Sequence, residues 1–314
     1  MNDHRAPETA AALRERALRA IAANRTPGFH FAGNFCEVAF THDESGSRVT
    51  LGAGPHNTGR DGGVEFAILA MAADMALAAA IRTELDARTR LATVSMSLQM
   101  TGAPALGDVD ARGTFEGFLG AGEARQGLSR VDVTSAGQAV AFGHGAFMPL
   151  QAPPGIELFP MPGPERLSAA PADEADLSEA ERALMAHFDA TLADPEAEGQ
   201  FMRRLLGFHP RRTGTGATGV LENGAHVANR VGHVQGGLLA GFAAATACAA
   251  LPQNWMLTAI TACFTSPGQG AQLRASARVL HHGMMTAVVQ TEVTGGNRRR
   301  VLEATTTHAR VVGN

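Results

Sequence analysis

The sequence is poor in cysteine and contains no lysine. Its three cysteines, Cys36, Cys248 and Cys263, are odd in number and far apart along the chain. They can therefore form neither a disulfide framework nor a Cys-x-x-Cys metal site. Because secreted domains are often held together by disulfides, we expect a cytoplasmic protein.

The sequence also has no long basic run. The 314 residues carry a formal net charge of -4, and every one of the 26 basic residues is arginine. Since binding to a phosphate backbone needs a broad cationic surface, the sequence argues against nucleic acid as a partner and favours a small molecule. The densest basic run is Arg298-Arg299-Arg300, after Gly295-Gly296 in a predicted hairpin turn. These arginines either bind the phosphates of a ligand or form a solvated charge run.

A membrane span is not expected either. The longest uncharged apolar stretch, 236–251, is rich in alanine, stops before Pro252 and falls short of the roughly 20 residues that a bilayer span needs. The first residues, MNDHRAPETAAALRERAL, mix acids and arginines where a signal peptide needs an apolar core. We predict a buried core helix at 236–251 and no membrane partner.

The most informative positive feature is an internal repeat. A predicted amphipathic helix at 8–24 has a counterpart at 178–193. Each is followed by strand-like sequence, at 29–40 and 48–54 in the first half and at 215–229 in the second. A Pro-rich stretch, 151–176, separates the halves as a linker. We predict an N-terminal helix (1–27), a first unit (28–150), the linker, and a second unit with its own leading helix (177–314).

The centre of each predicted unit is a helix preceded by paired glycines. The stretch NTGRDGGVEFAILAMAADMALAAAI (57–81) matches NRVGHVQGGLLAGFAAATACAAL (229–251), so that Asn57 corresponds to Asn229 and Gly62-Gly63 to Gly236-Gly237. Strand-like sequence follows at 91–100 and 257–266, then Gly-containing turns and closing hairpins. A helix apolar around most of its circumference and followed by about four strands predicts an α+β fold, in which an antiparallel sheet wraps a central helix.

This order of landmarks resembles the hotdog fold, specifically the acyl-CoA thioesterases of the phenylacetate-pathway type, here duplicated into a double hotdog. The motif of that family is N-x-x-G-x-x-[HQ]-G-G, which NRVGHVQGG (229–237) fits completely. NTGRDGG (57–63) is one residue shorter and has Asp61 in place of His or Gln. The resemblance covers roughly residues 28–150 and 195–312.

The paired glycines have a chemical interpretation. A helix N-terminus presents unpaired N–H groups and the positive end of the helix dipole, and glycine lets a carbonyl approach them. Gly236 and Gly237 would thus stabilise the oxyanion of thioester hydrolysis. The alternative is that the glycines only permit close packing of the helix.

Hydrolysis also needs a carboxylate as general base or nucleophile. The resemblance places this acid nine positions after the His or Gln, at Ala70 or Ala244. Asp74, one turn beyond Ala70, is the acid deep within a central helix, and it is either hydrogen-bonded as structure or held for chemistry with a shifted pKa. A local slip in the shortened segment before the helix would bring it closer to the expected place.

Each half lacks what the other has: the second has the complete motif but no acid in its helix, and the first has acids but an incomplete motif. This predicts one asymmetric site. Asp74 from the first half would face Gln235, Gly236 and Gly237 of the second, with Gln235 orienting the thioester or water. Asp61 is a second candidate acid, or a helix cap. The remaining candidates for substrate binding have structural alternatives in turns, caps or core packing; they are Asn229, Asn57, Gly62, Gly63, Glu65 and Thr246, with Cys248 as a further lining residue.

The sequence thus predicts an acyl-CoA thioesterase, with water attacking the thioester under Asp74 assistance. No cofactor is expected beyond the coenzyme A of the substrate, and no metal, because His226 and His233 lack the spacing of a helical metal pair and His281-His282 lie beside a turn. The chain would be a monomeric pseudo-dimer or a homodimer. Alternatives are a non-catalytic acyl-CoA or acyl-ligand binding protein and, less favoured, a hotdog hydratase. The sequence does not identify the acyl chain.

Overall fold

The computed structural model of the protein describes residues 9–25, 30–43, 46–86, 89–151, 169–197 and 199–311. Most of the expected linker, residues 152–168, lies outside the described residues, as do 1–8, 26–29 and 312–314 at or near the expected boundaries. Within the described residues, no helix is both long and apolar enough to cross a membrane.

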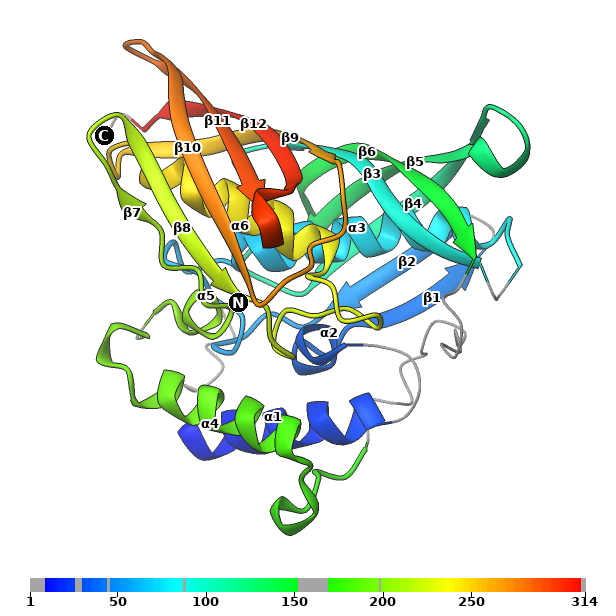
Figure 1. Ribbon diagram of the computed structural model, residues 1–314, viewed down its shortest axis with the longest axis vertical. Coiled ribbons are helices and arrows are strands. Elements are labelled where there is room, and N and C mark those ends of the chain that lie inside the picture. Colours follow the sequence, from blue (N-terminus) through cyan, green and yellow to red (C-terminus); the bar gives the residue numbers. More distant parts are fainter. Residues whose placement is uncertain are drawn as a thin grey trace.

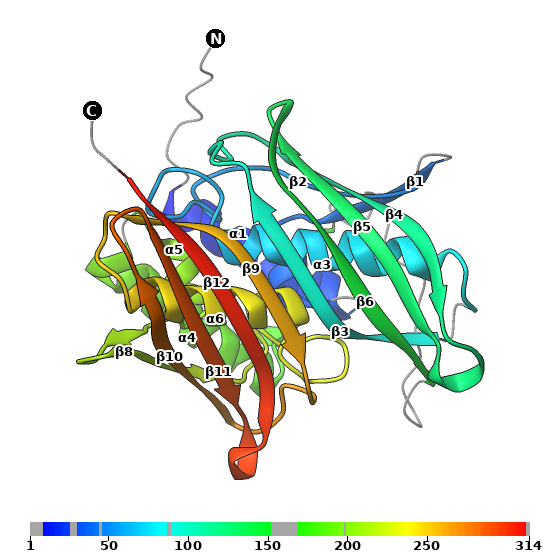
Figure 2. The same cartoon turned by 90° about the horizontal axis from the view of Figure 1, so that it is seen from above.

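The described residues form one antiparallel sheet of twelve strands, in the order β1-β2-β4-β5-β6-β3-β9-β12-β11-β10-β8-β7. This order is mirrored about the central β3–β9 pair, where Ser95 lies opposite Cys263 and Gln99 opposite Ala259. Each half thus contributes six strands (Figure 2). The strands are β1 (Ala39–Asp43), β2 (Gly46–Leu51), β3 (Thr89–Met100), β4 (Val109–Leu119), β5 (Gln126–Ser135), β6 (Gln138–Gln151), β7 (Arg211–Arg212), β8 (Gly216–Glu222), β9 (Trp255–Phe264), β10 (Gln272–His282), β11 (Thr286–Thr294) and β12 (Arg300–Arg310).

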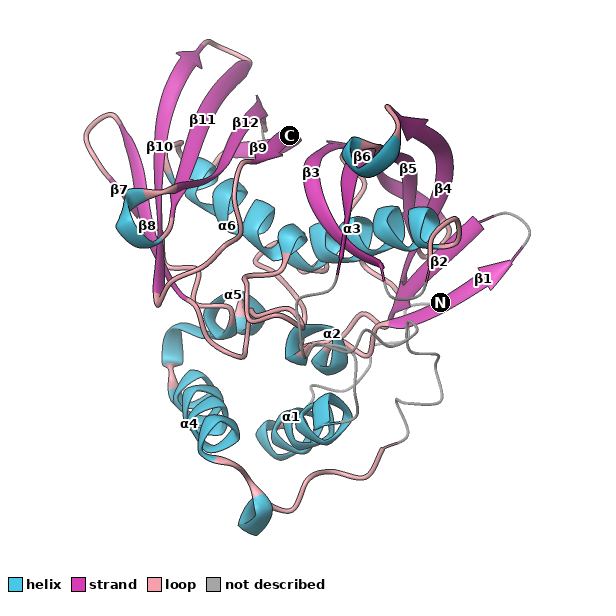
Figure 3. Cartoon of the chain, turned by 45° about the vertical axis from the view of Figure 1, so that its right-hand side comes forward, coloured by secondary structure: helices cyan, strands magenta, loops and turns pink. Residues whose placement is uncertain are grey.

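Two long apolar helices fill the inside of the curved sheet, α3 (Phe66–Arg82) and α6 (Gly236–Ala249) (Figure 3). Their N-terminal halves cross in opposite directions at small residues. A Cβ atom at Gly241 would lie 2.5 Å from the Cβ of Ala67, and one at Gly237 would lie 2.4 Å from the carbonyl oxygen of Ala70. Glycine at both positions therefore allows the helices to approach this closely.

A second helical layer lies below α3 and α6 in Figure 1. It consists of the leading helices α1 (Ala10–Arg25) and α4 (Glu179–Ala193) and the short helices α2 (Phe31–Phe35) and α5 (Phe201–Leu205). Arg14 joins the first two helices, because its guanidinium pairs with Glu174 just before α4 and with Asp189 on α4. Four short 3₁₀ turns complete the described helices, at Gly122–Ala124, Glu174–Asp176, Pro195–Ala197 and Gly296–Arg298.

The strand prediction for residues 29–40 was wrong in its central part, which is the helix α2. His30 caps this helix by accepting the N–H of Gly33, and the rings of Phe31 and Phe35 stack one turn apart in the core. All five residues of α2 are buried, so the apolar spacing that suggested a strand belongs here to a single helical turn in the core. Similarly, His281 and His282 end strand β10, and the turn begins after them.

The internal repeat is confirmed, but its register at the helix N-termini differs from the one we predicted. Glu65 caps α3 and donates its N–H to the carbonyl of Asn57, while Gln235 caps α6 and donates its N–H to the carbonyl of Val227. The bridges Thr58–Val64 and Ala228–Val234 repeat at the same interval. Residue 65 therefore corresponds to residue 235, and GPHNTGRDGGVE (54–65) aligns with GAHVANRVGHVQ (224–235) without a gap.

This register corrects two predictions. Asn57 corresponds to Val227 and not to Asn229, and Gly62 corresponds to Gly232, since both glycines take the same left-handed turn conformation with φ of 79° and 76°. The first-half segment before the helix is therefore not shortened, and Gly62-Gly63 is a turn before the helix, which begins at Phe66. The predicted α+β class, with two tandem units that each wrap a central helix in antiparallel strands, is confirmed.

Candidate active site

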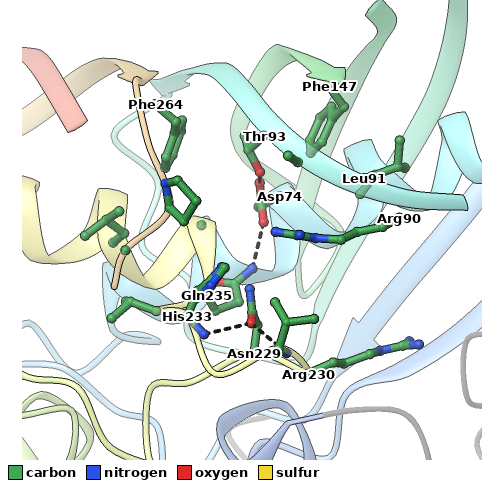
Figure 4. Close-up of a pocket in the computed structure, with 18 of the residues that line it drawn as sticks. Asp74, Arg90, Leu91, Thr93, Phe147, Asn229, Arg230, His233, Gln235 and Phe264 are labelled. Carbon is green, nitrogen blue, oxygen red and sulfur yellow. Dashed lines mark hydrogen bonds between the residues drawn. The ribbon is translucent and has the colours of Figure 1, made fainter. Parts of the chain in front are cut away.

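A cavity of about 420 Å³ lies where the two halves meet (Figure 4). Its walls come from the C-terminal half of α3, the start of β3, the end of β6, the loop 229–235 before α6, and the turn after β9. Apolar side chains form much of the lining, with a small number of polar groups among them, as in most small-molecule sites. The apolar members include Met75, Leu91, Phe147, Leu150, Leu239 and Phe264.

Asp74 is the acid in this wall, and residues from both halves hold its carboxylate. Its Oδ1 accepts the hydroxyl of Thr93 on β3 at 2.9 Å, and its Oδ2 accepts the side-chain N–H of Gln235 at 2.7 Å. The backbone amide of Gly237 also interacts with the carboxylate. The structure thus brings Asp74 together with the loop and helix end of the other half, as the predicted asymmetric arrangement requires.

The surroundings of Asp74 shift its acidity in opposing directions. Only 6% of the residue is exposed, and burial is the largest effect, raising the pKa from its ordinary value of 3.8 to about 6. The hydrogen bonds from Thr93, Gly237 and Gln235 lower the pKa and so limit this rise. Because each carboxylate oxygen has two lone pairs, the carboxylate keeps acceptor capacity for a further ligand.

Gln235 is held at both ends of its side-chain amide. Its Oε1 accepts the N–H of Leu238 at 2.8 Å and so caps α6, while its Nε2 donates to Asp74. These two contacts fix which amide atom is oxygen and which is nitrogen. The second N–H of Nε2 therefore remains for a ligand in the cavity.

The two glycines of the motif have different surroundings. Gly236 lines the cavity, and a Cβ atom there would lie 2.9 Å from the hydroxyl of Thr93 and 3.1 Å from Oδ2 of Asp74. Its N–H makes no hydrogen bond to the part of the chain that the structure describes. Gly237 is buried against α3 instead, where a Cβ atom would meet the backbone of Ala70 and Met71. The surroundings of Gly237 thus fit the packing interpretation, whereas Gly236 lies at the cavity wall.

Asn229 shapes the loop that leads into α6. Its side-chain oxygen accepts the backbone N–H groups of Val231 and His233 at 3.0 and 3.1 Å, and the residue lines the cavity. These contacts fit the bracing role weighed from the sequence. The neighbouring His233 is hydrogen-bonded to Gln269 at 2.7 Å, and its pKa is lowered chiefly by burial.

The other sequence candidates do not line this cavity. Asp61 is exposed and accepts the N–H of Gly63 in the turn before α3. The remaining candidates lie in the same loop, at the N-terminus of α3 or inside α6; they are Asn57, Gly62, Gly63, Glu65 and Thr246. The side chains of Asn57 and Thr246 bond the local backbone, whereas that of Glu65 makes no capping hydrogen bond to α3. Arg298–Arg300 lie at the β11–β12 turn, where Arg300 pairs with Glu292 and Glu303.

The corrected register accounts for the one-turn displacement of Asp74 from the expected place. Counting nine positions from Asp61 gives Ala70, but the residue equivalent to Gln235 is Glu65, and nine positions from Glu65 is Asp74. No local slip is needed. Sequence reasoning missed Thr93, because strict alternation from the buried Met96 and Leu98 places it on the opposite face of the strand. A register shift between Thr93 and Ser95 turns its side chain toward α3.

The equivalent helix N-terminus in the first half is built differently. Phe66 and Ala67 occupy the positions of Gly236 and Gly237, and Ala244 occupies the position of Asp74. Glu65, in the position of Gln235, has a pKa raised chiefly by burial, with Arg203 acting in the opposite direction. Cys248 lies near Arg203 and Glu65, and burial raises the pKa of its thiol to about 11.

No cluster of three or more metal-ligating side chains occurs in the residues covered by the structure. His226 is buried and stacks on His187 with ring centroids 4.5 Å apart, and burial is the main cause that lowers its pKa to about 4. A neutral, stacked ring of this kind is a core residue.

No protein-family model and no curated protein matches the sequence. Solved structures do match. A protein of unknown function with a hot dog fold from Alicyclobacillus acidocaldarius is 11% identical, with a TM-score of 0.51, and the match covers 89% of this chain and 97% of that one. A provisionally named oleoyl thioesterase from Lactobacillus plantarum is 12% identical, with a TM-score of 0.50 and coverage of 87% and 100%.

A third structure, a provisionally named thioesterase II from Thermobifida fusca, is 14% identical, with a TM-score of 0.50 and coverage of 88% and 96%. At these identities the likeness concerns the fold. The chain has a double hotdog fold, in which two units follow one another and their central helices pack together.

Proposed function

We propose that the protein is an acyl-CoA thioesterase that hydrolyses its substrate at a single site between the two hotdog units. The observation that carries this proposal is the contact between Asp74 and the Gln235 cap of α6 at the wall of the cavity. A carboxylate with a pKa raised to about 6 lies beside a helix N-terminus whose first amide is unpaired within the described chain. The provisional thioesterase names of two structures with the same fold agree with it.

Asp74 is the proposed general base. At neutral pH a carboxyl group with a pKa of about 6 is mostly ionised, yet basic enough to accept a proton from water. As the water oxygen forms a bond to the thioester carbon, its proton passes to Asp74 and the carbonyl π electrons move to the carbonyl oxygen. Thr93 and Gln235 keep the carboxylate aimed at the cavity throughout this step.

The Gly236 amide is the proposed donor to the developing oxyanion. It is the first N–H of α6, so the helix dipole adds to its hydrogen bond. When the tetrahedral intermediate collapses, the C–S bond breaks and its electron pair leaves with the sulfur of coenzyme A. Asp74 then returns its proton to the thiolate, which gives the free thiol and the carboxylic acid. One such donor contributes about 10²- to 10³-fold in comparable sites.

The direct test is release of thiol from acyl-CoAs with short, medium, long and aromatic acyl groups. We expect turnover with the wild-type protein, a loss of about 10²- to 10⁴-fold with Asp74→Asn, and unchanged turnover with the control Asp61→Asn, since that carboxylate lies outside the cavity. Equal activity of wild type and Asp74→Asn would refute the role of Asp74. Binding of acyl-CoA without any turnover would instead support the alternative, a non-catalytic acyl-CoA binding protein.

A further inference from the structure

The cavity wall is unbalanced in charge. Asp74 is the only acid among the described residues that line it, whereas three arginines do so, Arg82, Arg90 and Arg230. In Figure 4 the side chain of Arg90 extends into the cavity, while that of Arg230 extends away from Asp74. An apolar acyl chain alone gives no reason for guanidinium groups in the wall.

Arg82 lies on the same face of α3 as Asp74. Residues 74, 78 and 82 are spaced by four, so they line one side of the helix, and all three line the cavity. Eight residues of helix advance by about 12 Å. Between the acid and the guanidinium the helix offers the small side chains of Ala78 and Ala79, which leave room for an extended chain to lie along it.

The Arg82 guanidinium has no acidic partner among the described residues. One of its N–H groups donates to the carbonyl of Thr89 at 2.8 Å, and burial lowers its pKa. Arginine has five N–H donors, so most of them remain for another acceptor. Partly buried cations are normally paired, and an anion supplied by a ligand would provide that pairing.

The two ends of the cavity differ in a way that orients the substrate. At one end are the loop residues Arg230 and His233 and the largely exposed turn 265–267. On the other side of Asp74 in Figure 4 lies Phe147, and Ala78 and Ala79 continue the cavity wall along α3 toward Arg82. A volume of about 420 Å³ has room for an acyl group and part of a pantetheine arm but not for the whole of coenzyme A, so the nucleotide would lie outside. The polar, open end suits that exit, and the acyl chain then extends toward Arg82.

We propose that the preferred acyl groups end in a carboxylate, so that the substrates are coenzyme A monothioesters of dicarboxylic acids, with Arg82 binding the terminal carboxylate. This inference rests on the proposed thioesterase function. Guanidinium and carboxylate form a charge-assisted, often bidentate pair. A neutral acyl chain of equal length leaves the buried cation unpaired.

The test compares chains of equal length with and without the terminal carboxylate, namely adipyl-CoA with hexanoyl-CoA and suberyl-CoA with octanoyl-CoA. We expect the wild-type kcat/KM to favour the charged member by about ten- to a hundredfold. Arg82→Gln, which keeps a donor for the Thr89 carbonyl, should remove this preference through the KM of the charged substrate and leave the neutral one nearly unchanged. The control Arg278→Gln, an exposed strand residue, should keep the wild-type ratio.

Three results would overturn the inference. The first is a wild-type preference for the neutral chains, and the second is a preference that survives Arg82→Gln but disappears in Arg90→Gln. Should Arg82→Gln prove unstable, Arg82→Lys retains the charge, and its failure to favour the charged chains would be the third. Absence of turnover with every thioester would refute the proposed function itself, a result distinct from turnover without charge preference.

Discussion

At the N-terminus of α6, Gln235 caps the helix and Gly236 leaves its first turn open to the cavity, whereas at the N-terminus of α3 the corresponding residues are Glu65 and Phe66. The facing position on the other helix is Asp74 in the first case and Ala244 in the second. The backbone of the two helix N-termini is nearly the same, as their repeated hydrogen bonds show. The loop and helix start are therefore present in both halves, whereas the combination of Asp74, Gln235 and Gly236 occurs at only one of the two helix N-termini.

The comparison shows which residues depend on chemistry and which on packing. Gly54, His56, Arg60, Gly62 and Val64 have identical counterparts in the second half and build the loop. Gln235 and Gly236, which line the cavity, differ from Glu65 and Phe66 at the N-terminus of α3. Arg230 and Val234 also line it but are the same residue types as Arg60 and Val64, so lining the cavity does not by itself account for a difference.

After Asp74→Asn, the largest expected effect distinguishes the two glycines of α6. Gly236→Ala should lower turnover by about 10²- to 10³-fold, because the added methyl group meets Thr93 and Asp74 and screens the amide proposed as oxyanion donor. Gly237→Ala should instead lower the melting temperature, since its methyl group meets the α3 backbone and overpacking costs about 1–3 kcal/mol. Turnover and thermal unfolding of both variants distinguish the roles; full activity of Gly236→Ala would show that the open first turn has no part in catalysis.

The next largest effect is expected when the N-cap residue of α6 is replaced by the residue type found at the N-cap of α3. Gln235→Glu puts a second carboxylate beside Asp74, so the two groups share a proton and titrate as a pair with one pKa raised. We expect the acidic limb of the pH profile of kcat/KM to move to higher pH. Activity at pH 7 should fall about twofold if the pKa reaches 7 and should approach a tenfold loss for each further unit. The reciprocal Glu65→Gln should leave the profile in place. A changed profile in Glu65→Gln would assign chemistry to the N-terminus of α3.

A smaller effect is expected from Thr93→Val. The general base works when ionised, so activity falls as the pH drops through the pKa of Asp74, about 6. The Thr93 hydroxyl lowers that pKa, and its removal should shift the acidic limb to higher pH, with a loss of a few-fold near neutrality that disappears in alkaline buffer. Thr246→Val, in a helix position where the hydroxyl bonds only the Phe242 carbonyl, is the matched control. Loss at every pH would indicate that Thr93 acts otherwise than through the acidity of Asp74.

Much of the fold could be predicted from the sequence because order and periodicity carry it. The repeat, the two apolar helices and the strand-turn-strand endings are all local patterns. The short helix at Phe31–Phe35 was missed because two buried phenylalanines four residues apart also fit a strand with one irregular position. The continuity of the sheet through β3 and β9 depends on pairing between distant strands, which no local pattern encodes.

In the candidate site, too, some residues could be predicted from local sequence, while the way in which distant residues meet could not. Asp74 could be named because an acid inside an apolar helix is unusual, and Gln235 and Gly236 could be named because NRVGHVQGG fits the motif that the sequence resembles. The alignment of the two halves could not be predicted correctly. The adjacent glycines at 62–63 resemble those at 236–237 in sequence, but the first pair forms a turn before its helix. Arg82 gave no signal at all, because an arginine in the last turn of a helix is ordinary until the cavity beside it is known.

The smallest effect on turnover is expected from placing an acid in α6 at the position that corresponds to Asp74 in α3. Ala244→Asp restores an acid facing the N-terminus of α3, but its neighbour in the Gln235 position is Glu65, which offers no donor when ionised, and Phe66 occupies the place of the open glycine. The new carboxyl group would therefore be buried without the partners that Asp74 has, which costs about 1–3 kcal/mol of stability. We expect wild-type turnover from Ala244→Asp with a lower melting temperature, and no recovery of activity when it is added to Asp74→Asn. Recovered turnover in that double variant would mean that a carboxylate facing either helix N-terminus suffices and that the cap and first-turn residues contribute little.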